Sequence, residues 1–274
     1  MSVKGKRVGF LGCGNMGEAL VKGLVEAHVV PADALIASDS REDRLADLDR
    51  RYKIRVTKTN VDLVGESDVV VLAVKPQIMT PVLKEISGAL SARHLVISIA
   101  AGVSTAKIHE GVGKELRIIR VMPNTPALVL EGATAIAKAK GLKDGDLETA
   151  QEIFGAVGKV VVLDEELMDA VTGLSGSCPA YVALVIESLA DGGVKMGLDR
   201  ITAMTLATQT VLGAAKLLSE TSMHPGALKD MVSSPGGTSI TGVSALEEGG
   251  IRTTFITAVE RATQRSRELG RGPA

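Results

Sequence analysis

The sequence is poor in aromatic residues, which make up only 2% of it, and it contains no Trp. Proteins that bind single-stranded nucleic acid stack the bases on aromatic side chains, so this composition disfavours such a platform. Charge points the same way, because 31 Lys and Arg residues are balanced by 32 Asp and Glu residues. The net charge of -1 offers no basic field to nucleic acid or to an acidic membrane surface. We therefore expect neither as a partner.

Cysteine is equally scarce. Cys13 and Cys178 are far apart, and neither has a CxxC neighbour or a nearby His. A zinc site needs a set of such ligands, so we expect no metal. Polar residues interrupt the apolar stretches before the roughly 18 positions of a membrane-spanning helix. The first residues run into a strand-like segment rather than the apolar core of a secretory signal. These absences predict a cytoplasmic protein without a membrane partner.

Apolar and amphipathic segments alternate along the first part of the 274-residue chain. Strands are expected at 7–12, 35–37, 68–74, 94–99 and 117–121, with shorter ones near 133–137 and 159–163. Such alternation predicts βαβ units, a parallel sheet and right-handed crossovers. After Asp164 the pattern is helical, with helices expected at 181–196, 201–218 and 252–269.

We therefore predict an α/β protein with two domains. An N-terminal Rossmann domain with a doubly wound sheet occupies residues 1–164, and an all-helical C-terminal dimerisation domain occupies residues 165–274. So much apolar helix in the second domain also predicts an oligomer interface. The alternative is an ordinary monomeric bundle.

A GxGxxG motif, Gly12-Cys13-Gly14-Asn15-Met16-Gly17, follows the first predicted strand and opens a helix. In this context the first glycine allows a tight turn, the second lets the backbone approach a pyrophosphate, and the third lets helix and strand pack closely. The helix N-terminus adds free N–H groups and the positive end of a dipole. The motif predicts a bound dinucleotide, and the strand–helix context disfavours a glycine-rich turn without a ligand.

The end of the second predicted strand bears on the choice of cofactor. Asp39 lies about 20 residues after the motif, where an acid bonds the ribose 2′-OH of NAD. The same place also holds hydroxyl and guanidinium groups that suit a 2′-phosphate, from Ser38, Ser40, Arg41 and Arg44. A solvated first helical turn is the alternative for the two arginines. We favour NADPH, with NADH as the second choice.

Two other segments stand out. Ala73-Val74-Lys75-Pro76 ends a buried strand, where ligands of open α/β sheets bind, and Lys75 there suits a phosphate or ribose. In the helical region, a Ser-Pro-Gly-Gly turn within residues 230–239 precedes a helix. Its backbone N–H groups, with the Thr238 and Ser239 hydroxyls, predict a seat for a carboxylate. A loop with a capping hydroxyl is the alternative.

These motifs together resemble the pyrroline-5-carboxylate reductase family. The ordered set is GFLGCGNMG, AVKP, ISIAAGV, MPNTPA, EGAT, AVTGLSGSCPAY, ADGGVKMGL and VSSPGGTSITGVSALEEGG, and it extends over about residues 6–269. The last motif is the most specific. Two positions depart from the family pattern: Cys178 replaces the usual Gly of a tight turn, and Ser239 replaces the usual Thr but keeps the hydroxyl.

The resemblance implies reduction of 1-pyrroline-5-carboxylate, a cyclic imino acid, to L-proline with NAD(P)H. It also implies a homo-oligomer, either a dimer or a decamer of dimers. With the glycine motif, the expected cofactor residues are Gly12, Cys13, Gly14, Asn15, Met16, Gly17, Ser38, Asn60, Ala73, Val74, Lys75, Pro76, Ala100 and Ala101. The expected substrate residues are Glu165, Gly236, Gly237, Thr238 and Ser239, with Thr238 and Ser239 also catalytic. Met231 lies where family members contact the cofactor of a neighbouring subunit.

Catalysis would depend on positioning, because a cyclic imine that binds protonated accepts a hydride directly. A Ser239 hydroxyl contact to the ring nitrogen would assist the proton balance. Glu165 would offset the positive charge, or is simply a solvated acid. Two other functions stay open: a related Rossmann oxidoreductase of imines or 3-hydroxy acids, and a non-catalytic protein that senses NADPH. An oxidoreductase of 3-hydroxy acids typically needs a catalytic lysine on the interdomain helix. Lys195 is the only lysine of the expected helix at 181–196 and lies near its end, which argues against that function.

Overall fold

The computed structural model describes residues 3–271, and for Arg271 only the backbone. The chain forms two compact units. The first runs to Ser177 and takes up the chain again from Arg261, and the second comprises Cys178–Glu260. The expected division at 164/165 stays a prediction, and the outermost residues of both expected domains, 1–2 and 272–274, lie outside the described part.

The first unit is built on one sheet. Its strands are β1 (Val8–Leu11), β2 (Leu35–Ser38), β3 (Arg55–Thr57), β4 (Val69–Leu72), β5 (Leu95–Ser98), β6 (Arg117–Met122), β7 (Gly132–Lys138) and β8 (Gly158–Asp164). They lie in the order β3-β2-β1-β4-β5-β6-β7-β8. Strands β1 to β6 are parallel, with Val8 paired to Leu35 on one side and to Val69 on the other. The strand order therefore reverses between β1 and β4, which is where Rossmann folds bind ligands. The predicted doubly wound sheet is confirmed.

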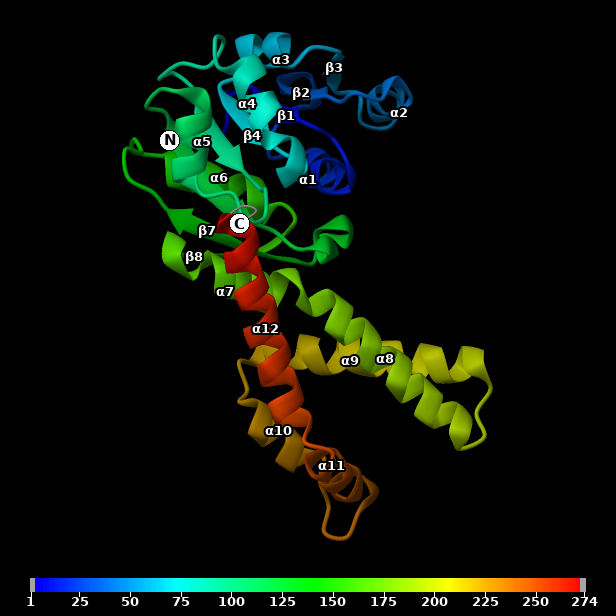
Figure 1. Ribbon diagram of the computed structural model, residues 1–274. Coiled ribbons are helices and arrows are strands. Elements are labelled where there is room, and N and C mark those ends of the chain that lie inside the picture. The colour runs from blue at the N-terminus through cyan, green and yellow to red at the C-terminus, as the bar shows by residue number, and fades with distance from the viewer. Residues whose placement is uncertain (1–2, 272–274) are drawn as a thin grey trace. The chain divides into compact units, whose positions relative to one another are not determined.

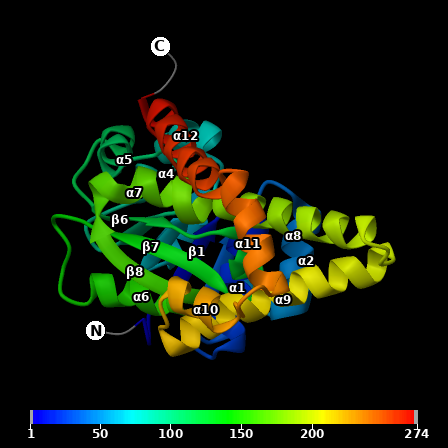
Figure 2. The ribbon, with the colours of Figure 1, turned by 90° about the horizontal axis from the view of Figure 1, so that it is seen from below.

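One strand pair departs from the predicted parallel sheet. Val121 of β6 pairs with Ile136 of β7 in the antiparallel sense. Residues 123–131, which include a short 3-10 helix at Thr125–Val129, are too few for the crossover of a dozen or more residues that parallel strands need. Strand β8 is parallel to β7, because the helix α6 (Asp146–Gly155) joins them; this helix lies along β8 (Figure 2).

Helices cover both faces of the sheet (Figure 1). One face packs against α1 (Asn15–Glu26), α2 (Glu42–Tyr52) and α6, through residues such as Leu20, Leu48 and Phe154. The other packs against α3 (Asn60–Glu66), α4 (Met79–Ile86) and α5 (Thr105–Val112). Alternate residues of β4 point to opposite faces, since Val69 and Val71 belong to the first core and Val70 and Leu72 to the second. Burial on both faces explains the apolar runs of these strands.

Strand β3 and helix α3 are among the elements of this unit that the sequence pattern missed. Strand β3 is short and mostly exposed, so it lacks an apolar run. Helix α3 begins after Thr59, whose side chain accepts a hydrogen bond from the Asp62 N–H, but the helix is too short to show a clear period. Both lie beside the cofactor edge of the sheet.

The second unit is helical, as predicted. Helices α8 (Cys178–Lys195) and α9 (Arg200–Thr221) pack against each other through small side chains, Ala190, Ala203 and Ala207. They are followed by α10 (Pro225–Met231), α11 (Thr238–Glu248) and the start of α12 (Ile251–Arg271). Helix α12 ends in the first unit, where the Ser266 hydroxyl donates to Asp169 at 2.7 Å.

Two helical stretches, Glu165–Lys195 and Arg200–Thr221, have the length and apolar composition of a membrane-crossing helix. By composition alone this is weak support for a membrane, because helices that pack against other protein pass the same test. It nevertheless differs from the expectation that polar residues break every such stretch. Ala, Leu, Val and Ile residues keep the average hydropathy of these stretches high, although Gly, Thr and other residues between them interrupt any continuous apolar block. The expected absence of a membrane partner stays a prediction.

Candidate active site

The three motif glycines lie in different environments. Gly12 has φ of +80°, and a Cβ added there would lie 2.7 Å from Val74 Cγ1. At Gly17 an added Cβ would lie 2.9 Å from the Gly12 carbonyl oxygen. At Gly14 it would meet nothing within 4 Å, and φ is -66°. Two of the glycines are thus required by the fold itself, whereas Gly14 leaves open space where a ligand approaches the backbone.

The open side of the loop also presents unpaired donors. The first helical hydrogen bond of α1 runs from the Glu18 N–H to the Gly14 carbonyl at 2.9 Å. The N–H groups of Asn15, Met16 and Gly17 precede it and so have no partner within the helix. Open space with N–H groups at a helix N-terminus fits a pyrophosphate. The loop therefore suits the dinucleotide that the motif predicts.

A cavity of about 330 Å³ lies beside the loop, at the carboxyl ends of β1, β2 and β4. The predicted cofactor residues that line it are Gly12, Gly14, Ser38, Asn60, Ala73, Val74 and Lys75, together with Asp39 and Ser40. Ser38 and Asn60 are linked, because the Ser38 hydroxyl donates to Asn60 Oδ1 at 2.8 Å. The structure thus brings together cofactor residues from four separate segments of the chain.

The other predicted cofactor residues have different surroundings. The Cys13 side chain is buried in the core, and burial raises the pKa of its thiol to about 12. Its backbone N–H donates to Asp39 at 3.1 Å, so Cys13 offers a ligand no free donor. Met16 packs against the same core. Ala100 is buried, while Pro76 and Ala101 line a neighbouring cavity of about 580 Å³.

The two arginines after β2 are used differently. Arg41 is 60% exposed, its backbone N–H donates to Asp39 at 3.0 Å, and its guanidinium lies 4.0 Å from the same carboxylate. Arg44 is turned inward, with its Nε donating to the Cys13 carbonyl at 2.8 Å. Arg41 therefore stays available to a 2′-phosphate, whereas Arg44 contacts the glycine loop instead.

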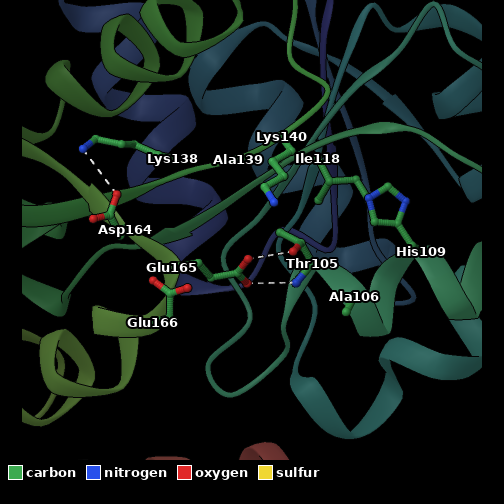
Figure 3. A pocket seen from close by; sticks show the side chains of 10 residues that line it. All are labelled: Thr105, Ala106, His109, Ile118, Lys138, Ala139, Lys140, Asp164, Glu165 and Glu166. Atoms are coloured by element: carbon green, nitrogen blue, oxygen red, sulfur yellow. Dashed lines mark hydrogen bonds and ion pairs between the residues drawn. The ribbon is translucent and has the colours of Figure 1, made fainter.

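Glu165 lies at the start of a short 3-10 helix after β8, beside a cavity of about 610 Å³ (Figure 3). One carboxylate oxygen accepts the Thr105 N–H at 3.0 Å, and the other accepts the Thr105 hydroxyl at 2.7 Å. Glu165 therefore holds the first residue of α5 and is not the solvated acid of the alternative interpretation.

The sequence did not single out Arg120, which lies in β6 between two acids. Its side chain is 8% exposed, with guanidinium nitrogens 3.7 Å from Glu165 and 3.9 Å from Asp169. The sequence did contain a signal for this residue, because a positive charge inside the apolar segment RIIRVM is rarely buried without an acidic partner and so predicts one. Across residues 3–271, no group of three or more His, Cys, Asp or Glu side chains is arranged to hold a metal ion.

The remaining predicted substrate residues lie in the second unit, at the start of α11. Gly236 has φ of +66°, and the Gly237 N–H donates to the Ser234 carbonyl at 3.0 Å. The Gly237 amide is therefore not free for a carboxylate, contrary to expectation, because the turn itself uses it. The first helical bond runs from Thr241 to Gly237 at 3.3 Å, so the N–H groups of Thr238 and Ser239 precede it. Thr238 is exposed and Ser239 half-buried.

Comparison with known proteins covers both units. A family model described as pyrroline-5-carboxylate reductase dimerisation matches residues 165–269, and one described as NADP oxidoreductase, coenzyme F420-dependent, matches residues 7–102. A pyrroline-5-carboxylate reductase of Methanosarcina acetivorans is 50% identical over 98% of this chain and 100% of that protein. One from Arabidopsis thaliana is 46% identical over 96% of this chain and 95% of that protein.

Solved structures agree. A pyrroline-5-carboxylate reductase from Coxiella burnetii has a TM-score of 0.92 at 37% identity, covering 96% of this chain and 98% of that one. The Plasmodium falciparum pyrroline carboxylate reductase, solved with NADP bound, has a TM-score of 0.87 at 35% identity, covering 97% and 99%. A 3-hydroxyisobutyrate dehydrogenase of Mycobacterium tuberculosis, at 15% identity and a TM-score of 0.52, shares the fold alone. The resemblance of the motifs is confirmed, and the chain belongs to the pyrroline-5-carboxylate reductase family.

Proposed function

We propose that this protein reduces 1-pyrroline-5-carboxylate to L-proline with NAD(P)H, the last step of proline biosynthesis. The extent of the identity carries the proposal, because 50% identity with a named reductase covers 98% of the chain and so includes the glycine loop and the Ser-Pro-Gly-Gly turn alike. NADPH is the favoured cofactor and NADH the alternative. Exposed Arg41 supports that preference, because it directly follows Asp39 and Ser40, which line the cavity.

The first unit would hold the cofactor with the residues that line the cavity beside the glycine loop. NAD(P)H, when bound, supplies a hydride. The loop N–H groups would bind the pyrophosphate, and Lys75, which is exposed at the end of β4, would approach a phosphate or the nicotinamide ribose. Ala100 and Ala101, directly after β5, would border the reactive end of the cofactor.

The second unit would hold the substrate carboxylate at the start of α11. The N–H groups of Thr238 and Ser239 and the two hydroxyls replace the Gly237 amide in this role, since that amide is spent in the turn. The imine nitrogen would enter carrying the proton that the reaction needs, so the ring carbon accepts a hydride and the nitrogen becomes a neutral amine. Ser239 Oγ would contact that nitrogen and keep it oriented.

Glu165 would supply a fixed negative charge toward the iminium. Thr105 binds both of its oxygens, so the carboxylate keeps one orientation and does not act as a mobile base. A guanidinium nitrogen of Arg120 lies 3.7 Å from the same carboxylate and helps to fix its position. The expected role is electrostatic stabilisation of the bound cation.

The helical unit would form the oligomer. An apolar groove of about 490 Å³ lies on it, and residues of α8, α11 and α12 line it, among them Tyr181, Leu184, Leu246 and Phe255. A second copy covering such side chains explains their apolar character without a membrane. We propose a homodimer, with a decamer of dimers as the larger assembly and exposed Met231 reaching the cofactor of a neighbour. The protein would be cytoplasmic, with no nucleic acid or membrane partner.

One assay tests the reaction: oxidation of NADPH with 1-pyrroline-5-carboxylate, followed at 25 °C beside a 3-hydroxy acid with NADP⁺ as the control pair. Turnover with the imine alone is expected. Turnover with the hydroxy acid alone would favour the related oxidoreductase, although exposed Lys195 at the last residue of α8 is poorly placed for that chemistry. Cofactor binding without turnover of either substrate would favour a sensor. Light scattering at one subunit's mass would refute the oligomer.

A further inference from the structure

Arg44 makes its contacts behind the glycine loop. Its Nε donates to the Cys13 carbonyl at 2.8 Å, its Nη2 donates to the Gly14 carbonyl at 3.4 Å, and Nη2 also pairs with Glu18. The side chain is only 13% exposed. One guanidinium thus joins two consecutive carbonyls of the loop to the first turn of α1, and its fork of donors suits such planar recognition.

Glu18 is itself held by the neighbouring helix. The Tyr52 hydroxyl donates to it at 2.8 Å, and Arg51 lies 2.5 Å away. Burial works against ionisation of Glu18, but the hydrogen bonds from Tyr52 and Arg44 and the charges of Arg44 and Arg51 outweigh it, so its pKa is lowered. Glu18 is therefore anionic at neutral pH and anchors the Arg44 guanidinium.

The Cys13 and Gly14 carbonyls that Arg44 binds belong to the peptides whose N–H groups are available to a pyrophosphate. Earlier in the loop, the Gly12 N–H donates to the Ser38 carbonyl at 2.9 Å and the Cys13 N–H donates to Asp39 at 3.1 Å. Neither N–H group is therefore available to a ligand. The next N–H groups are those of Gly14 and Asn15. Each shares a planar trans peptide with a carbonyl that Arg44 holds, and in such a peptide C=O and N–H point in opposite directions.

We propose that Arg44 is a positioning residue for the dinucleotide loop: it pulls the Cys13 and Gly14 carbonyls to one side and thereby aims the Gly14 and Asn15 N–H groups at the cofactor pyrophosphate. The inference rests on the proposed use of NAD(P)H. It assigns Arg44 a different role from the 2′-phosphate contact that its place after β2 indicates. Because both cofactors carry the pyrophosphate, Arg44 serves NADH and NADPH equally.

Titration calorimetry of the full-length protein with NADPH and with NADH tests this inference. Arg44→Met is expected to weaken both by about tenfold, the effect of removing hydrogen bonds made by one charged group, and to leave their ratio unchanged. Arg44→Lys keeps the charge but lacks the fork, so it is expected to restore little of the affinity. Arg50→Met is the matched control, since that side chain is on the same helix and is 77% exposed.

A second measurement addresses the loop directly. In Arg44→Met without cofactor, amide hydrogen exchange is expected to be faster than in the wild type at Cys13 and Glu18, whose N–H groups are hydrogen-bonded within the loop. The kcat at saturating cofactor is expected to change little. Should Arg44→Met fail to fold, Glu18→Gln removes the anchor and is expected to weaken both cofactors in the same proportion. A loss confined to NADPH, or unchanged binding of both, would overturn the inference. A wild-type protein that binds neither nucleotide would instead refute the proposed function.

Discussion

A side chain at position 14 is expected to block the cofactor while leaving the fold intact. Gly14 has φ of -66° and ψ of -163°, an extended conformation open to any residue, and an added Cβ meets nothing within 4 Å. Gly14→Val therefore adds no strain to the folded protein, and surface changes of this kind alter stability by less than about 0.5 kcal/mol. The unfolding temperature is expected to stay within a few degrees of the wild type.

The valine side chain is instead expected to destabilise the complex with NADPH. A phosphate oxygen must come within ~2.9 Å of a backbone nitrogen to bond it, whereas a methyl group keeps heavy atoms at ~3.5–4.0 Å. Displacing the pyrophosphate removes one or two charge-assisted hydrogen bonds of ~1.5–3 kcal/mol each. Gly14→Val is thus expected to weaken NADPH binding by roughly tenfold to 10⁴-fold.

Gly17→Ala is the matched comparison. Its new Cβ would lie 2.9 Å from the Gly12 carbonyl oxygen and 3.3 Å from Cys13 Sγ, so helix and strand must separate. Overpacking of this kind costs ~1–3 kcal/mol of folding free energy. Calorimetry with NADPH and thermal unfolding at fixed protein concentration measure both quantities. A Gly14→Val protein that binds NADPH as tightly as the wild type would show that the pyrophosphate does not lie on this loop.

Three further changes have defined outcomes. Ser239→Ala should lower turnover by roughly 10²-fold with NADPH binding unchanged; an undiminished rate would remove the hydroxyl from the reaction. Thr134 Oγ1 is buried without a hydrogen-bond partner among the described residues, so Thr134→Val should raise the free energy of unfolding in urea by about 1 kcal/mol, and a decrease would show that the hydroxyl is satisfied. Glu18 has a folded pKa below its ordinary 4.5, so its contribution to stability is complete above pH 4.5 and is lost as the pH falls through the folded value. Glu18→Gln should therefore flatten that part of the acid unfolding curve, and an unaltered slope would contradict the assignment.

Much of the first unit is predictable because its strands are buried on both faces. Runs such as 68–74, which are apolar at almost every position, are typical of central strands, and the glycine motif between the first strand and its helix is typical of phosphate binding. Strand β3 cannot be predicted in this way, because its residues Arg55 and Val56 are exposed and form no apolar run. The direction of β7 escapes it too, because the apolar pattern of a strand is the same whichever way the chain runs.

Side-chain partners are harder to predict than backbone elements. Glu165 appeared from its DEE neighbourhood to be either a solvated acid or a substrate contact, and its bonds to Thr105, 60 residues away, follow only from the folded sheet. The Gly237 amide looked available from a Ser-Pro-Gly-Gly pattern, yet the same pattern makes the turn that consumes it. In both cases the residue type indicated a functional position, but the sequence did not reveal which group the residue binds.

The two arginines after β2 illustrate why specificity for NADPH is not a count of basic residues. Both lie within a few positions of the ribose end of the cavity, but a guanidinium that bonds Cys13, Gly14 and Glu18 has few donors left for a phosphate. Asp39 accepts the Cys13 N–H with one carboxylate oxygen, and its other oxygen lies 4.0 Å from the Arg41 guanidinium, which is 60% exposed. By binding Arg44, the glycine loop leaves the exposed Arg41 guanidinium as the one of the two that we propose distinguishes NADPH from NADH.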